Sequence, residues 1–495
     1  MSSRALAGAD LAIGAPVAHL ELDGVWAVDP AAGREGTADL VVEEGVLADL
    51  EWHESSGARR GRGRATSDGQ RHGLVVAPGF VDLHAHFREP GFEDAETIVT
   101  GQAAAAHGGF TTVCLMPNTE PPIDEAPTLR TVLARAAESG IPVRVLAWGA
   151  ATRRREGKGM AELGDLAEAG AIGYSDDGAP IPVGLLRNVL AYAGMLGRVV
   201  ADHAEDRELT SGAEANEGLI GTILGLKGWP RSAEESVIAR DIAILVDVLG
   251  SDSSAARLHL THVSTAGGID LVRRAKAAGL PVTCDVTPHH LALTDEWLAG
   301  ARRWSWQAWQ DGPDRDGSGA PTANPWAGDA LAGPPYDPAL KVNPPLRTPS
   351  DAIALLAGLR DGTVDAIATD HAPHTLVDKE VEFGLAANGI SGIETALGIV
   401  LVAVEAGKVS LLRAVEALTV GPARVLGPAG VPAPALEVGR LADLVLFDPA
   451  DGWLVSESAL SSRGKNSPLL GRSLPGRVLL TVGAGRLAYR DPDLA

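Results

Sequence analysis

FVDLHAHFREP, residues 80–90, places two histidines one residue apart at the end of an apolar run. On a β-strand, residues i and i+2 point to the same side, so His84 and His86 should project together while Ala85 turns away. Two imidazoles on one side can hold one cation, because nitrogen ligands suit zinc. A single such pair is more often structural than metal-binding, so the rest of the chain must decide between the two interpretations.

Composition limits the classes of protein to consider. The 495 residues predict two domains, one of them large. A formal net charge of −22 argues against nucleic acid or an anionic membrane surface as the main partner. The two cysteines, Cys114 and Cys284, lie in apolar stretches and predict reduced thiols. The sequence has neither a signal-peptide pattern nor an apolar run of about 18 residues, so we expect a cytoplasmic protein.

From residue 76, apolar runs of strand length alternate with Ala/Leu/Glu/Arg-rich helical stretches. Eight runs read as strands, at residues 75–86, 110–118, 142–149, 171–177, 198–206, 257–264, 281–290 and 364–374. Eight β/α units in about 350 residues predict an α/β fold, a (β/α)8 TIM-like barrel with insertions.

The two ends of the chain differ in pattern from this middle part. Residues 16–50 show short alternating runs with Gly and Asp turns, and strand-like sequence returns from residue 436. We expect the ends to pair into one small β-rich domain flanking the barrel; two unrelated caps are the alternative. The predicted division is residues 1–75 and 436–495 for the small domain and 76–435 for the metal-dependent barrel.

Two segments fit this scheme poorly. Residues 299–340, rich in Gly, Pro, Asp and Trp, form an insertion between the seventh and eighth strands. Bulky rings seek burial and argue against complete disorder of the insertion; its tryptophans are Trp304, Trp306, Trp309 and Trp326. A packed lid, an oligomer contact and a flexible insertion all remain open. Residues 54–72, polar and rich in Gly and Arg, are interpreted as a solvated loop rather than a contact patch.

Most of the predicted strands end in residues that can bind a metal or form hydrogen bonds. These residues are His84, His86, Asn118, Asp176, Asp177, His203, His262, His289, His290, Asp370, His371 and His374. In a barrel, the carboxyl ends of the strands converge on the face where active sites lie. We therefore expect His203 and His262 to hold a second cation, Asp177 to bridge the cations and Asp370 to complete the first site.

Taken singly, each of these residues also has a structural interpretation. His203 and His262 can hydrogen-bond to neighbours along the chain, Asp177 can belong to a turn and Asp370 can cap a following helix. The joint metal-binding interpretation is preferred, because the separate structural accounts would all have to end on one barrel face. The histidines interpreted as structural are His107, His259, His289 and His290.

This ligand set predicts a class of reaction. Cations bound by His and Asp lower the pKa of bound water from 15.7 towards about 7 and polarise a carbonyl group. A carboxylate can then move the proton to a departing nitrogen. Amide or cyclic-amide hydrolysis, or its reverse, follows. The sequence contains no Gly-rich phosphate loop, nucleophile elbow or paired CxxC, which disfavours nucleotide-driven and thiol chemistry.

Several motifs resemble the amidohydrolase superfamily and, within it, the dihydroorotases of the longer bacterial type. They are PGFVDLHAHFREPG, GGFTTVCLMPNTEP, GYSDDG, VADHAED, LTHVSTAGG, VTPHHLALTD, KVNPPLR, IATDHAPHT, NGISGIETAL, GRLADLVLFDP and GKNSP, in this order along the chain. The resemblance covers nearly the whole chain, with gaps at residues 54–72 and 299–340.

The resemblance implies a metal centre with one or two zinc ions per subunit, two being the expected number. One ion would be bound by His84, His86 and Asp370, and the other by His203 and His262. Asp177 would bridge them, and Asp370 would also shuttle the proton.

The resemblance also implies how an anionic substrate is held. Arg88, Asn118 and His374 would hold the substrate carboxylate, and His86 would also contact the substrate. The ring would be seated by Asn343 and by the backbone of Asn388 and Gly389. The role of Arg88 agrees with the charge argument, because an acidic protein needs a local cation to bind an anion, and guanidinium pairs bidentately with carboxylate.

The implied reaction is the reversible cyclisation of N-carbamoyl-L-aspartate to (S)-dihydroorotate and water, the third step of de novo pyrimidine biosynthesis. Related hydantoinases and allantoinases carry a carboxylated lysine at the bridging position, whereas AIGYSDDG (171–178) has none. One alternative is another cyclic amidase of the hydantoinase, dihydropyrimidinase or allantoinase kind, for which Arg88 would be superfluous. Another is a non-catalytic partner subunit of aspartate carbamoyltransferase, which should have lost metal ligands.

Three features depart from the family pattern. The insertion at 299–340 lies just before Asn343, Asn388 stands where relatives often carry an aromatic residue, and the 54–72 loop has no assigned role. For partners we expect a homo-oligomer and a small anionic substrate. The family alone suggests association with aspartate carbamoyltransferase.

Overall fold

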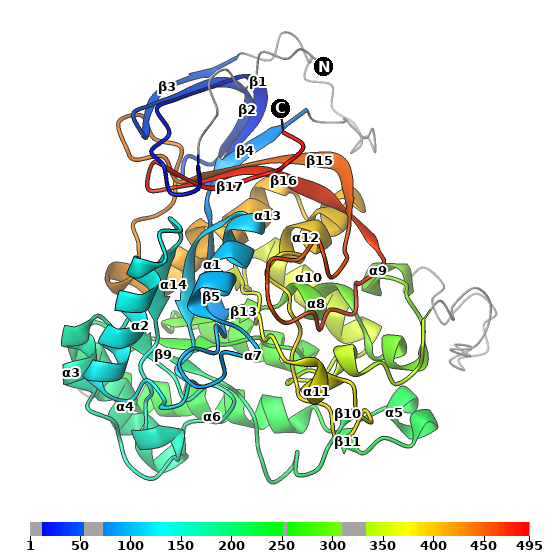
Figure 1. Ribbon diagram of the computed structural model, residues 1–495. Helices are drawn as coiled ribbons and strands as arrows, with labels where there is room; N and C mark the ends of the chain where they lie inside the picture. The colour runs from blue at the N-terminus through cyan, green and yellow to red at the C-terminus, as the bar shows by residue number, and fades with distance from the viewer. Residues whose placement is uncertain (1–11, 54–72, 251–254, 309–332, 495) are drawn as a thin grey trace.

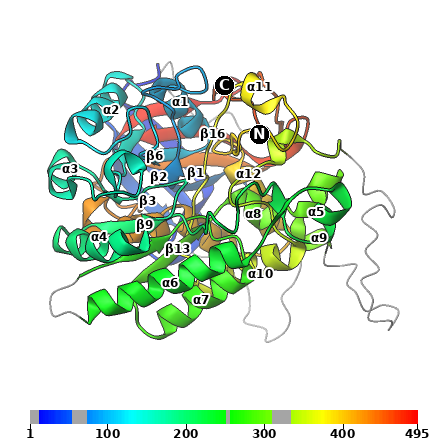
Figure 2. The ribbon, with the colours of Figure 1, turned by 90° about the horizontal axis from the view of Figure 1, so that it is seen from below.

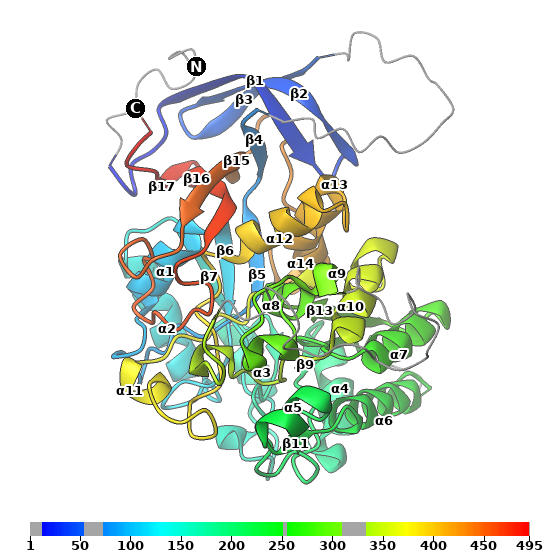
Figure 3. The same ribbon diagram turned by 90° about the vertical axis from the view of Figure 1, so that its right-hand side faces the viewer.

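The computed structural model describes residues 12–53, 73–250, 255–308 and 333–494. A sheet forms one end of the molecule, and parallel strands surrounded by helices form the rest (Figures 1 and 3). The fold is thus mixed α/β. The predicted loop at 54–72, and Trp309 and Trp326 of the insertion, lie outside the described residues.

The sheet at one end has seven strands in the order β17-β16-β15-β4-β1-β2-β3 and combines the two ends of the chain. The strands are β1 (His19–Asp29), β2 (Arg34–Glu43), β3 (Val46–Trp52), β4 (Val75–Pro78), β15 (Leu444–Leu454), β16 (Ser473–Gly483) and β17 (Arg486–Arg490). β4 pairs in parallel with β1 and antiparallel with β15, so it joins the two ends. Alternation builds the sheet's core: Leu20 and Leu22 are buried, whereas Glu21 between them is exposed.

In the helical part, each of the eight runs that the sequence predicts supplies one strand, and the first run, residues 75–86, also contains β4 of the seven-stranded sheet. The eight strands are β5 (Phe80–Ala85), β6 (Phe110–Leu115), β7 (Arg144–Ala147), β8 (Gly173–Tyr174), β9 (Val199–Asp202), β12 (Leu258–Leu260), β13 (Val282–Val286) and β14 (Ala366–Ile367). They pair in parallel in two sheets, β5-β6-β7 and β14-β13-β12-β9-β8. Single parallel bridges join Gly149 to Tyr174 and Ala85 to His371, one at each junction between these sheets.

Helices cover these strands on the outside, as the view from below shows (Figure 2). The longer ones are α1 (Ile98–His107), α2 (Ala126–Glu138), α3 (Leu163–Ala169), α4 (Val183–Met195), α6 (Ser232–Leu249), α7 (Ala266–Ala277), α10 (Pro349–Asp361), α12 (Ala396–Glu405), α13 (Leu411–Leu418) and α14 (Val420–Leu426). α2 buries Leu129, Val132 and Ala136 at helical spacing. All six residues of β5 are buried, as expected for a parallel strand covered on both faces.

Shorter elements lie in the connections: β10 (Ala215–Asn216), α5 (Leu219–Leu224), β11 (Gly228–Trp229), α8 (Pro288–Ala292), α9 (Ser305–Ala308) and α11 (Leu376–Lys379). The start of the predicted insertion is packed. Trp304 and Trp306 are buried and stack at 5.8 Å, and the Arg472 guanidinium lies 4.7 Å from the Trp304 ring centroid.

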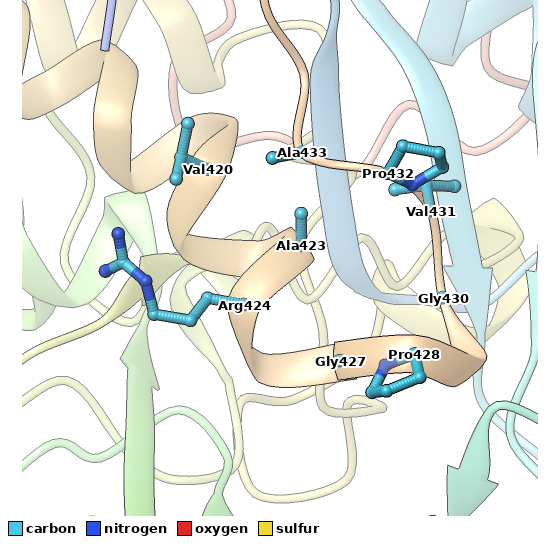
Figure 4. A pocket seen from close by; sticks show the side chains of 9 residues that line it. All are labelled: Val420, Ala423, Arg424, Gly427, Pro428, Gly430, Val431, Pro432 and Ala433. Atoms are coloured by element: carbon cyan, nitrogen blue, oxygen red, sulfur yellow. The ribbon is translucent and has the colours of Figure 1, made fainter. Parts of the chain in front are cut away.

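One pocket lies away from the carboxyl ends of the strands. It is formed by α14 and the turn after it (Figure 4), where Ala423 and Val431 pack against Val81 near the start of β5. The paired histidines stand at the other end of β5. Within the described part of the chain, no helix is long and apolar enough to cross a membrane.

Candidate active site

The two histidines of the opening motif face acids that follow other strands. His84 and His86 are buried, with ring centroids 5.1 Å apart. His84 Nε2 lies 3.2 Å from Asp177 Oδ1 and 3.4 Å from Asp370 Oδ1. His86 Nε2 lies 3.1 Å from Asp370 Oδ1, and its Nδ1 is hydrogen-bonded to Asn118 Oδ1 at 2.9 Å. Asp177 follows β8 and Asp370 follows β14, so strands far apart in the chain supply this group.

Asp177 lies between this pair and a second pair of histidines. Its Oδ1 is 3.8 Å from His203 Nδ1 and 3.9 Å from His262 Nε2, and those two nitrogens are 3.0 Å apart. Candidate ligand atoms lie within 4.8 Å of one another in His84–His86–Asp177 and again in Asp177–His203–His262. The structure therefore brings all six predicted metal-binding residues to one buried place.

The electrostatics of this cluster favour a cation. Burial disfavours charge on His84, but Asp177 and Asp370 outweigh it and raise the His84 pKa to about 10. Burial also favours the neutral carboxyls, yet His84 and neighbouring histidines hold the pKa of Asp177 and of Asp370 well below the ordinary range. Both carboxylates stay ionised, so the cluster attracts positive charge.

The donor set fits a metal ion. Among the described residues, the buried Nδ1 of His84 has no hydrogen-bond partner, and Nε2 faces only the carboxylates of Asp177 and Asp370, so the ring has no other partner to explain its position. His203 Nε2 is hydrogen-bonded to Glu205 Oε2 at 3.0 Å, which leaves Nδ1 directed at Asp177 and His262. Carboxylates orient metal-binding histidines in this way. Imidazole nitrogens and carboxylate oxygens are ligands suited to zinc and similar cations.

Glu205 is a site residue that the sequence did not single out. It accepts hydrogen bonds from Thr210 Oγ1 at 2.5 Å and from Asn343 Nδ2 at 3.1 Å, in addition to its bond with His203. The structural interpretation of His203 was a hydrogen bond to a neighbouring acid. The bond between His203 Nε2 and Glu205 exists, and His203 Nδ1 still faces Asp177 in the cluster. The two-residue spacing of His203 and Glu205 was the available signal.

The structural alternative for His262 does not occur. Ser264 and Thr265, its possible partners along the chain, hydrogen-bond to Glu234 through their backbone amides and hydroxyls. The backbone amide of His262 donates to Asp285 Oδ1 at 2.7 Å, which fixes the chain where the histidine leaves β12.

The alternatives for the two acids are also resolved by their contacts. The Asp176 carboxylate accepts hydrogen bonds from the amide and hydroxyl of Thr152, so the first acid of SDDG supports the loop and Asp177 faces the cluster. The helix after β14, α11, is capped by Thr375 and not by Asp370. Three of the four histidines interpreted as structural have partners outside the six candidate ligands: His107 with Glu394, His259 with Asp285, and His290 with the Pro344 carbonyl. The Nε2 of the fourth, His289, is buried without a hydrogen-bond partner among the described residues.

The predicted substrate-binding residues form a group beside Asp370. Arg88 Nε donates to the Pro373 carbonyl at 3.1 Å, and Arg88 Nη2 lies 3.3 Å from His374 Nε2. His374 Nε2 also bonds to the Asn388 carbonyl at 2.8 Å. Burial lowers the pKa of Arg88 to about 10, and burial together with Arg88 lowers the pKa of His374 to about 3. At neutral pH a charged guanidinium therefore stands beside a neutral imidazole.

Asn118 and Asn343 are the two predicted substrate-binding asparagines, and they lie near the histidines and acids of the cluster. Asn118 contacts His86, and its Nδ2 is 3.5 Å from Asp177 Oδ2. Asn343 Oδ1 is buried and has no partner among the described residues, which leaves it available to a ligand. Asn118 thus contacts two candidate metal ligands, and Asn343 contacts Glu205, the acid that is hydrogen-bonded to His203.

The backbone is unusual at three of these positions. Arg88, His262 and Asp370 have φ angles of 59°, 37° and 47°. Residues other than glycine rarely adopt this left-handed backbone conformation, and such conformations cluster at functional sites. The strained positions lie just beyond three different strands and direct their side chains to one region.

Comparison with known proteins identifies the family. A model of the Dihydro-orotase-like family matches residues 73–266. A dihydroorotase of Pelotomaculum thermopropionicum is 41% identical over 474 residues, covering 95% of this chain and 99% of the relative. The chain belongs to the dihydroorotase family. A second member, from Anaeromyxobacter sp. strain K, is 43% identical over 473 residues, with 95% and 98% coverage. The resemblance inferred from the motifs is confirmed.

Solved structures agree with the fold. An L-hydantoinase from Arthrobacter aurescens has a TM-score of 0.72 at 24% identity, covering 94% of this chain and 95% of its own. A dihydropyrimidinase from Brevibacillus agri has a TM-score of 0.68 at 19% identity, covering 95% of each chain. At such identities the likeness concerns the fold, and the dihydroorotase family membership rests on the sequence relatives.

Proposed function

We propose that the chain catalyses the reversible, zinc-dependent cyclisation of N-carbamoyl-L-aspartate to (S)-dihydroorotate and water, in de novo pyrimidine biosynthesis. The observation that carries the proposal is the buried position of Asp177 between two histidine pairs, with Arg88 beside the same cluster. Relatives that are 41% and 43% identical over 95% of the chain are dihydroorotases, which supports it.

Two zinc ions fit the donor set. His84, His86 and Asp370 would hold one, His203 and His262 the other, and Asp177 both. Zinc bound there would supply Lewis acidity and make water a nucleophile at neutral pH.

Asp370 is suited to move the proton. Its carboxylate is ionised and lies 3.1 Å from His86 Nε2, and its charge is the largest that acts on Arg88. In hydrolysis, Asp370 accepts a proton from the attacking water and gives it to the ring nitrogen as the C–N bond breaks. In cyclisation, Asp370 takes the proton from the carbamoyl nitrogen and returns it to the oxygen that leaves as water.

Arg88 supports dihydroorotate over the uncharged rings of the other cyclic amidases. Its guanidinium is partly buried and forms no ion pair within 4 Å among the described residues, although the charges of Asp370 and Asp177 act on it from farther away. A buried cation without a counter-ion is costly, and a substrate carboxylate would satisfy it. Asn118, His374, Asn343 and the Asn388–Gly389 backbone would complete the contacts. An uncharged hydantoin or dihydropyrimidine would leave Arg88 unpaired, so we favour dihydroorotate.

We also infer that the eight parallel strands close into a (β/α)8 barrel, since single bridges span both junctions between the two parallel sheets. The predicted domain division at residues 75 and 435 is part of this inference, although β4 of the seven-stranded sheet extends to Pro78.

The presence of all six candidate ligands disfavours a non-catalytic subunit. Cytoplasmic location, homo-oligomer formation and association with aspartate carbamoyltransferase remain proposals, and size-exclusion chromatography and co-purification would test the last two.

The decisive experiment is an assay of purified protein with dihydroorotate and dihydrouracil side by side, with metal content measured on the same sample. We expect turnover of dihydroorotate, little turnover of dihydrouracil and up to two zinc ions per chain. Preference for dihydrouracil would support the hydantoinase-like alternative. A folded protein that neither retains nor responds to divalent ions would contradict the metal assignment.

A further inference from the structure

The GKNSP motif, residues 464–468, matches the family but has no role in the site described so far. It lies between β15 and β16, in the C-terminal part of the chain that also supplies the seven-stranded sheet. Asn466 in this motif is 7% exposed and lies next to the substrate group. A segment remote in sequence therefore reaches the candidate active site.

The Asn466 side chain uses its full hydrogen-bonding capacity. Nδ2 donates to the carbonyls of Ala372 and Gly389, each at 3.0 Å. Oδ1 accepts from the His374 amide and the Ser391 hydroxyl, each at 2.9 Å. These contacts fix the orientation of the amide, because a flipped side chain would direct its oxygen at two carbonyls. Asn466 thus ties together the two segments that carry His374 and Gly389.

Lys379 holds the Gly389 carbonyl as well. Its Nζ donates to the carbonyls of Gly389 at 3.0 Å and Ala387 at 2.8 Å, and the side chain is 5% exposed. The Gly389 amide donates to the Lys341 carbonyl at 2.8 Å. Both polar groups of Gly389 are therefore engaged, and its carbonyl receives donors from α11 and from the GKNSP motif.

The GKNSP segment is itself anchored firmly. The absence of a side chain at Gly464 permits close contact, because a Cβ there would lie 2.5 Å from Pro373 Cβ. Just before it, the backbone amides of Ser461 and Ser462 donate to Glu394 at 2.6 and 3.1 Å. A segment held in this way can define the position of the loops it contacts.

We propose that Asn466 and Lys379 are positioning residues, which orient Gly389 and His374 so that the ring and carboxylate of the substrate are held together. The inference rests on the proposed function, because Gly389 and His374 are its candidate substrate contacts. Among the described residues, neither side chain hydrogen-bonds to any of the six candidate metal ligands. The pair should therefore affect substrate binding and leave metal binding unchanged.

Asn466→Asp provides the test, because it keeps the shape and replaces the amide donor by an oxygen facing two carbonyls. We expect KM for dihydroorotate and for N-carbamoyl-L-aspartate to rise about tenfold or more. The turnover number should stay within about threefold and the zinc content should not change. Ser467→Ala is the matched control in the same segment, since the Ser467 hydroxyl accepts the Leu469 amide at 3.4 Å and leaves the two loops untouched.

Lys379→Met is the second variant and removes the other donor to Gly389. Lys379→Met should also raise KM. If Asn466→Asp does not fold, Lys379→Met alone tests the positioning role. KM within about twofold of wild type in the folded variants would overturn the inference, as would a fall in turnover accompanied by loss of zinc. If the wild type fails to turn over dihydroorotate, the proposed function fails and this inference with it. An active wild type with unaffected variants refutes the positioning role alone.

Discussion

At the scale of single residues, the site depends on charges that burial makes expensive. Asp177 and Asp370 stay ionised because histidines surround them, and His84 Nε2 lies 3.2 Å from one carboxylate and 3.4 Å from the other. Removing one member leaves the other charges uncompensated in a buried place. The contributions of these residues should therefore not be independent.

His84→Ala or Asp177→Ala should abolish zinc binding and activity together, because each removes a donor that lies within 4.8 Å of the other candidate ligand atoms. Metal analysis after gel filtration, beside a dihydroorotate assay, would check this. Activity that survives with wild-type zinc content would remove the residue from the ligand set.

Asp370→Asn keeps the shape of the side chain but removes the proton acceptor. We expect kcat to fall by about a hundredfold or more, with KM changed much less. Steady-state kinetics in both reaction directions would show it. Normal turnover would mean that Asp370 does not carry the proton.

Arg88→Ala should raise KM for dihydroorotate by about tenfold to a hundredfold, because a charge-assisted contact is lost. Arg88 has a pKa of about 10 and His374 a pKa of about 3, so neither changes charge between pH 5 and 9. The ratio of mutant to wild-type KM should then be constant across that range.

At the scale of elements, the strands and helices follow from local pattern, whereas the connections do not. The eight apolar runs all form strands, and the buried positions of α2 recur at helical spacing. β8 and β14 contain only two residues each, so their polar ends lie on irregular backbone with φ values such as the 47° of Asp370. Period-two alternation could not have given the direction of those side chains.

The segment around Gly389 offers a test at this scale. Its φ of 144° suits glycine, and a Cβ there would lie 2.6 Å from Ala372 Cβ and 3.1 Å from His374 Nε2. Gly389→Ala should therefore raise KM sharply while the protein stays folded, because the displaced segment is local. Gly407→Ala is a control at another positive-φ glycine with open space around it. Kinetics together with circular dichroism would separate the two effects.

At the scale of the whole molecule, the two chain ends share one core. Leu446 on β15 pairs with Val76 on β4, and both are fully buried among residues from the N-terminal strands. Leu446→Ala should reduce the free energy of unfolding by about 2–5 kcal/mol. Leu454→Ala, on the same strand but 59% exposed, should have little effect. Denaturant unfolding of both variants would check this; equal losses would contradict the shared core.

By itself, the sequence determined the class of the fold, the family and the six candidate ligands, because alternation and strand ends are local patterns that place His84 and His86 on one side. Only the tertiary structure decided which groups hold these residues. Glu205 bonds to Asn343, 138 residues away, and Asn466 to Ala372, 94 residues away. Hydrogen bonds between distant segments leave no periodic trace in a sequence, because they depend on how the strands and loops pack in space.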